Sequence, residues 1–122
     1  ILAPGGRIKG SDVYIQVSGK VVNGTEEYLK GTYRREDGTL TDNRKAGMVL
    51  NPSSIIGTQS TTIKAGSLLN TSQIGAPGQG TTYIELTGKG INASIGNNIG
   101  KIEGKEVLVE GNKGIRNIGG VI

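Results

Sequence analysis

Apolar and polar residues alternate in short runs along this chain. The runs DVYIQV at 12–17, TYIEL at 82–86 and EVLVE at 106–110 show the pattern most clearly. Strict alternation over four to eight residues predicts β-strands with one buried face. Gly or Asn follows each run within a few residues, as is typical of tight turns. No long amphipathic helix pattern is visible, so we predict an all-β chain.

Four segments repeat one phrase: 12–23, 62–70, 82–93 and 106–117. Each has an apolar–x–apolar pair, a turn and another apolar residue. An Asn stands at the end of each segment or next to its end. Aligning the segments, with the isoleucines that precede them, predicts five columns of equivalent residues. The columns are Val13, Ile63, Ile84 and Val107; Ile15, Ala65, Leu86 and Val109; Val21 or Val22, Leu68, Ile91 and Ile115; Asn23, Asn70, Ala93 and Asn117; and Ile8, Ile56, Ile74, Ile102 and Ile122.

The spacing of the repeat predicts the architecture. Ile63 and Ile84 lie 21 residues apart, Ile84 and Val107 lie 23 apart, and Ile102 and Ile122 lie 20 apart. A period near 20, made of three short strands and turns, predicts a parallel β-helix (solenoid) whose coils stack at about 4.8 Å. Stacked coils place like residues on like, so we expect aliphatic columns inside and an asparagine ladder at one turn.

One stretch interrupts the period. Val13 and Ile63 are separated by 50 residues, so either one coil carries an inserted excursion at 24–53 or two irregular coils lie there, and we favour the insertion. The dipeptide Asp37-Gly38 predicts a two-residue hairpin turn. Residues 25–47 hold many charges and two tyrosines, so we expect either a solvated loop or a contact surface for another molecule. The candidate contact residues are Tyr28, Tyr33, Arg34, Arg35 and Asp37.

Composition fits a narrow interior and excludes several chemistries. The 122 residues form a single domain in this interpretation, with 34% hydrophobic residues, 22 Gly, no Trp and no Phe. There is no Cys and no His, so disulfides, thiolate metal sites and Ser-His nucleophile pairs are excluded. No apolar run is long enough for a membrane-spanning helix. The net charge of +4 is scattered along the chain, which favours soluble sheet faces over nucleic-acid binding.

The carboxylates do not predict an enzyme. The alignment places Glu85 and Leu108 in one outward column, so it predicts no vertical carboxylate pair, and it leaves Glu106 and Glu110 on a solvated face. We therefore expect no catalytic residue, no metal site and no cofactor. Tyr14 and Tyr83 are expected to point outward. With the tyrosines of the excursion, they predict a small aromatic surface for contact with sugar or protein.

Three stretches resemble the haemagglutinin repeats of the filamentous haemagglutinin family, the exoproteins of two-partner secretion. They are GGRIKGSDVYIQVSGKVVN at 5–23, TTIKAGSLLNTSQIGAPG at 61–78 and KIEGKEVLVEGNKGIRNIGGVI at 101–122. The family includes adhesins and contact-dependent inhibition effectors.

This resemblance implies a right-handed β-helix, with residues 1–122 a segment of a larger exoprotein. It implies secretion or display at the surface of a Gram-negative bacterium, through a partner transporter in the outer membrane. The expected function is a rigid shaft and display surface in cell adhesion. The alternative is a module that binds a receptor or carbohydrate on a host or neighbouring cell through the 25–47 excursion.

Overall fold

A computed structural model describes residues 6–24, 32–34, 40–42, 53–94, 99–118 and 120–122. Strands and turns account for the regular structure of these residues, and none of them is helical. The chain is therefore all-β over the described ranges, as the alternating pattern predicts.

Parallel strands make up two sheets. The larger sheet contains six strands: β1 (Arg7–Gln16), β5 (Ser54–Ala65), β7 (Gln73–Ile74), β8 (Thr81–Leu86), β10 (Lys101–Ile102) and β11 (Glu106–Gly111). The smaller sheet contains four: β2 (Lys20–Asn23), β6 (Ser67–Asn70), β9 (Gly90–Ala93) and β12 (Ile115–Ile118).

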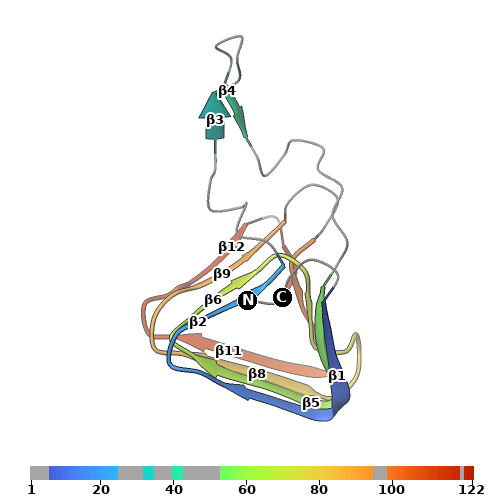
Figure 1. The fold of residues 1–122 in the computed structure, drawn as a ribbon. Coiled ribbons are helices and arrows are strands. Elements are labelled where there is room, and N and C mark those ends of the chain that lie inside the picture. The colour runs from blue at the N-terminus through green and yellow to red at the C-terminus, as the bar shows by residue number, and fades with distance from the viewer. Residues whose placement is uncertain (1–5, 25–31, 35–39, 43–52, 95–98, 119) are drawn as a thin grey trace.

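The two sheets form three sides around one core (Figure 1). The long strands β1 and β5 cover two sides each, because β5 pairs with β7 through its first residues and with β8 through its last. The bend falls where the β1–β5 register shifts between Gly10 and Asp12. We call one pass through the three sides a rung. The rungs are β1–β2, β5–β6, β7–β8–β9 and β10–β11–β12.

The central column of the core stacks one aliphatic residue per rung, but its members differ from the prediction. Register places Ile15, Ile63, Ile84 and Val109 in line. Val13 and Val107, predicted for this column, instead lie opposite Thr61 and Thr82. Both threonines are buried, and their hydroxyls bond to the backbone at the corner of the fold. The Thr61 hydroxyl accepts from the Gly57 amide, and the Thr82 hydroxyl donates to the Glu103 carbonyl. The predicted alignment was therefore wrong by two residues at each end of the column.

The other aliphatic columns contain similar corrections. Ala65 and Leu86 pair as predicted, but Gly111 rather than Val109 continues their column. On the third side the column runs through Val21, Leu68, Gly90 and Ile115, so Gly90 takes the place predicted for Ile91. On the remaining side it runs through Ile8, Ile55, Ile74 and Ile102, so Ile55 takes the place predicted for Ile56.

An asparagine ladder crosses all four rungs. Its members are Asn23, Asn70, Asn92 and Asn117, so the ladder is confirmed, although Asn92 rather than Ala93 belongs to it. Each amide Nδ2 donates to Oδ1 of the next asparagine, at 2.8, 2.8 and 2.9 Å. The first three side chains are at most 1% exposed. The ladder therefore fixes the register of the third side with specific polar contacts.

The length of a rung varies around the predicted value. Ile55 and Ile74 are 19 residues apart, and Ile102 and Ile122 are 20 apart, with Val121 bridged in parallel to Lys101. Ile74 and Ile102 are 28 residues apart. In this longer rung Asn92 and Ile102 are ten residues apart, whereas Asn70 and Ile74 of the preceding rung are four residues apart. Extra residues are accommodated where the third side returns to the first.

A separate antiparallel pair lies between β2 and β5. Strands β3 (Thr32–Arg34) and β4 (Leu40–Asp42) pair only with each other and stand away from the three sides (Figure 1). Arg34 lies opposite Leu40, whereas a regular two-residue turn at 37–38 would place Arg34 opposite Thr41. The register is therefore one residue away from the predicted hairpin, and the turn itself lies outside the described residues.

Candidate binding face of the larger sheet

One flat outer face is built by the last halves of β1 and β5 together with β8 and β11. Alternation sends every second side chain of these strands outward, so the face has three outward columns, one residue per rung. We call these twelve residues the outer face. They are Asp12, Ser60, Thr81 and Glu106; Tyr14, Thr62, Tyr83 and Leu108; and Gln16, Lys64, Glu85 and Glu110.

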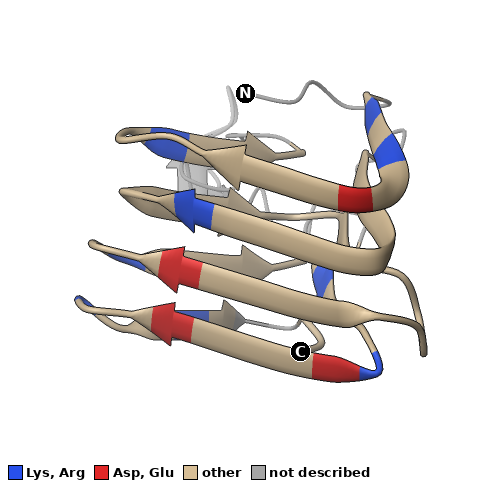
Figure 2. Ribbon diagram, turned by 90° about the horizontal axis from the view of Figure 1, so that it is seen from below, with Lys and Arg blue, Asp and Glu red and all other residues tan. Residues whose placement is uncertain are grey.

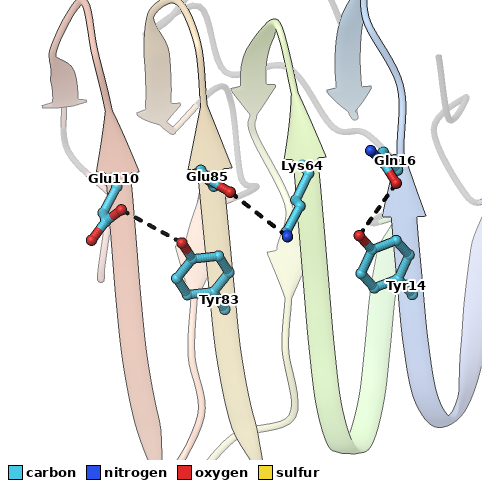
Figure 3. Close-up of polar contacts among 6 residues, drawn as sticks. All are labelled: Tyr14, Gln16, Lys64, Tyr83, Glu85 and Glu110. Atoms are coloured by element: carbon cyan, nitrogen blue, oxygen red, sulfur yellow. Dashed lines mark hydrogen bonds and ion pairs between the residues drawn. The ribbon is translucent and has the colours of Figure 1, made fainter.

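The middle column carries the two aromatic side chains of the face. Tyr14 is 59% exposed and Leu108 is 48% exposed, while Tyr83 is half-buried. Thr62 separates the two tyrosines, so they lie two rungs apart, or about 10 Å at the usual strand spacing. Both rings lean toward the neighbouring column (Figure 3). The Tyr14 hydroxyl donates to Gln16 Oε1 at 3.3 Å, and the Tyr83 hydroxyl donates to Glu110 Oε2 at 3.5 Å.

The third column of the outer face is charged. Lys64 Nζ lies 3.9 Å from Glu85 Oε2, and both side chains are nearly half exposed. The same ammonium lies 6.0 Å from the centre of the Tyr14 ring. An exposed ion pair and an exposed cation–π contact each contribute about 0.5–1 kcal/mol. These contacts orient the side chains more than they stabilise the fold.

Two carboxylates lie next to each other in this column. Glu110 pairs directly with Glu85, and Leu108 pairs with Tyr83. The prediction that Glu85 and Leu108 share a column was therefore wrong, because the actual register is shifted by two residues. Like charges on adjacent strands repel, and Lys64 on one side of Glu85 offsets part of that repulsion. Figure 3 shows the resulting sequence of polar contacts across the four strands.

The environment of Tyr83 keeps its hydroxyl protonated. Partial desolvation raises its pKa above the ordinary value of 10.0, the charges of Glu110 and Glu85 raise it further, and Lys64 acts in the opposite direction. The hydrogen bond to Glu110 also raises it, since that bond requires the phenol proton. At neutral pH Tyr83 is therefore a hydrogen-bond donor beside two acceptors.

A shallow groove of about 460 Å³ follows the charged column to the edge of the face. Gln16, Lys64 and Glu85 line one wall, and Ser18, Gly66 and Thr87 line the turns beyond the strands. The groove offers a carboxamide, an ammonium, a carboxylate and hydroxyls over a length of three rungs. Among the described residues, no three acidic side chains gather in a way that could hold a metal ion.

Of the five predicted contact residues of the excursion, the structure describes two, and neither belongs to the outer face. Tyr33 and Arg34 belong to β3, opposite Thr41 and Leu40. Tyr28, Arg35 and Asp37 lie outside the described residues. The structure therefore brings together Tyr14, Tyr83 and the charged column on the larger sheet, and sequence reasoning had identified only the two tyrosines of that set.

Comparison with protein-family models, with curated protein sequences and with solved structures finds no match to the chain. Within the part of the chain that the structure describes, no helix has the length and apolar character needed to cross a membrane. Functional inference therefore depends on the geometry of the rungs and of the outer face.

Proposed function

We propose that the chain is a right-handed parallel β-helix that serves as a rigid shaft segment of a secreted or surface-exposed bacterial exoprotein of the haemagglutinin type. The resemblance of its repeats to that family motivates the proposal. Export through a partner transporter of the outer membrane, and a role in cell adhesion, are parts of the same proposal. The shaft holds other modules away from the cell and presents its own faces along its length.

One observation carries this proposal: the same interior contacts recur on every rung. Ile15, Ile63, Ile84 and Val109 stack in line, and the asparagine ladder runs beside them. A fold in which each unit contacts only its neighbours gains length by adding units and keeps its cross-section. Such an architecture is suited to a spacer.

Removing one whole rung tests the proposal. Deletion of residues 64–84 joins Ile63 to Glu85, and Asn92 then falls beneath Asn23. We expect this shortened chain to keep a β-type circular dichroism spectrum and a cooperative melt. Deletion of 64–73 removes about half a rung and is the out-of-phase control, which we expect to unfold. Equal unfolding of both variants would argue against a repeating shaft.

The spacer role has its own test. The chain is placed between a bacterial surface anchor and an independent binding module. We expect the wild-type and the 64–84 deletion to present the module equally well, measured by binding of its ligand to whole cells. If removal of one in-phase rung abolishes presentation while the shortened chain still folds, the chain is not acting as a spacer.

The outer face favours a second candidate function, carbohydrate binding. Tyr14 and Tyr83 offer aromatic surfaces two rungs apart, and Lys64, Glu85 and Gln16 offer polar groups along the adjoining groove. Sugars bind through stacking of their C–H faces on aromatic rings and through hydrogen bonds to planar polar groups. The sequence had favoured the 25–47 excursion for this role.

Matched variants separate these two locations on the chain. We expect Tyr14→Ala and Tyr83→Ala to reduce binding to a glycan array about two- to tenfold each, since one lost stacking contact contributes about 0.5–1.5 kcal/mol. Tyr14→Phe, which retains the ring, should bind nearly as wild-type. Loss of binding on deletion of 25–47, with no effect of the tyrosine variants, would place the site on the excursion instead.

A further inference from the structure

Three basic side chains line one groove at a corner of the fold. The groove has a volume of about 280 Å³ and lies where β8 leads into β9 and β11 leads into β12. Lys89, Lys113 and Arg116 line it, all three are exposed, and no acidic residue is among the lining residues. Basic residues at the turns stand beyond the acidic ends of the neighbouring strands (Figure 2). We call this site the basic groove.

The rungs bring together charges that are far apart in the sequence. Lys89 and Lys113 are 24 residues apart, which is close to one rung at this height of the fold. Two backbone bonds tie their turns: the Gly90 amide donates to the Gly114 carbonyl at 3.0 Å, and the Lys113 amide donates to the Gly88 carbonyl at 3.1 Å. The expectation of scattered lysines is therefore wrong at this corner.

Two glycines are among the residues that line the groove. Gly114 has φ of 98°, a conformation that other residues rarely adopt, and a side chain added there would meet no atom within 4 Å. Gly90 pairs with Ile115 of the next rung and lines the groove with its backbone, and a side chain added at Gly90 would meet Leu86 and Ile115. Half-buried Ile91 and Ile115 form an apolar floor beside the three cations. The groove therefore has both a charged wall and a surface for the carbon skeleton of a ligand.

The described part of the chain does not neutralise the three cations. None of them forms an ion pair with another described residue, whereas Lys64 on the neighbouring face is paired with Glu85. The three positive charges lie on two adjacent rungs, whose strands are about 5 Å apart, so the charges repel one another. An anion placed between them would relieve this repulsion and gain three charge-assisted hydrogen bonds.

We propose that the basic groove binds a single tetrahedral oxyanion group, a phosphate or sulfate monoester, with Lys89 and Lys113 as point charges and Arg116 as a planar donor. The size of the site favours one such group over a nucleic-acid strand, because the three cations span only two rungs. No aromatic side chain lines the groove, and single-stranded nucleic-acid sites use aromatic rings to stack bases.

Amide NMR of the full chain tests the site with four probes: inorganic phosphate, inorganic sulfate, glucose 6-phosphate and glucose 6-sulfate. We expect saturable shifts confined to the amides of Gly90, Gly114, Ile115 and their neighbours. Tighter binding of the two sugar esters than of the inorganic ions would indicate a sugar-borne group that uses the apolar floor. Equal binding would indicate a site for the free ion. Both results support the oxyanion site, and absence of shifts with all four probes overturns it.

A pair of double variants separates a built site from general attraction. Lys89→Gln with Lys113→Gln should weaken binding about a hundredfold at low salt, about tenfold for each lost charge-assisted bond. Lys9→Gln with Lys105→Gln removes the same net charge from exposed positions outside the groove, and should weaken binding less than threefold. Equal weakening by both pairs overturns the site. So does tighter binding of an oligothymidylate than of any probe, which would indicate nucleic acid as the ligand.

Discussion

Replacing Asn70 with Ala removes the most connected side chain of the asparagine ladder. Its Nδ2 donates to Asn92 Oδ1 at 2.8 Å, to the Ser72 carbonyl at 2.8 Å and to the Lys101 carbonyl at 3.1 Å. Its Oδ1 accepts from Asn23 Nδ2 at 2.8 Å and from the Ser72 amide at 3.3 Å. The side chain is fully buried, so water cannot replace these bonds without a change in packing.

The expected loss follows from the partners that are left behind. Asn23 keeps its bond to the Gln73 carbonyl, and the Ser72 carbonyl keeps its bond from the Lys101 amide. The side-chain oxygen Oδ1 of Asn92 and the backbone amide of Ser72 each lose the hydrogen-bond partner that Asn70 provided. A buried polar group left without a partner costs about 1–3 kcal/mol. With two such groups, we expect the Ala variant to lose about 2–6 kcal/mol of unfolding free energy.

Urea unfolding followed by far-ultraviolet circular dichroism measures this loss. Asn117→Ala is the matched control, because Asn117 is the exposed last member of the same ladder and bonds to Asn92 and to the Gly120 carbonyl. We expect it to lose about 1 kcal/mol, since water can solvate the groups it leaves. Equal losses of about 1 kcal/mol for both variants would refute the inference that burial makes the ladder stabilising.

Three further predictions follow from other parts of the fold. Ile84→Lys should prevent cooperative folding in a thermal melt, because it places an unpaired charge at a position with no exposure; an unchanged melting temperature would contradict the observed core. Gly75→Ala should lower the melting temperature much more than Gly78→Ala: both glycines have positive φ, but a side chain at position 75 would collide with the backbone of a neighbouring rung, whereas position 78 is open. Ultraviolet titration should show Tyr83 ionising above its ordinary pKa, and Glu110→Gln should lower the pKa of Tyr83. The folded chain holds the Tyr83 proton to higher pH than the unfolded chain does. The stability from this proton is therefore present below about pH 10 and is lost as the pH rises further.

The alternating pattern identified the strands but not their register. Both Val13 and Ile15 point inward, as do Val107 and Val109, so a slip of two residues keeps every apolar side chain inside. Hydrophobic periodicity alone cannot distinguish the two alignments. The asparagine ladder can distinguish them, because a shifted asparagine would lose its hydrogen-bond partner on the next rung. Counting back seven residues from Asn92 and Asn117 gives Glu85 and Glu110, the carboxylate pair that the apolar alignment missed.

Features that depend on variable turn lengths were out of reach of sequence reasoning. Gly90 lies in an aliphatic column because Leu86 and Ile115 occupy the space that its side chain would need. The basic groove depends on the turns at Gly90 and Gly114 lying on adjacent rungs, which follows from register and not from local charge. The two-residue turn expected from Asp37-Gly38 was a local inference, and the register of β3 and β4 does not follow it.

The asparagine ladder gives the stack a direction. Every amide between Asn23 and Asn117 donates toward the C-terminal rung, so the side-chain dipoles add, and each bond polarises the next. One end of the row offers a carbonyl oxygen, which accepts from the Ser53 hydroxyl, and the other offers an amide donor, which reaches the Gly120 carbonyl. Another rung can extend the row only head to tail, since an inverted rung would bring donor against donor or acceptor against acceptor. The asparagine ladder therefore determines the single orientation in which a further rung can continue the stack.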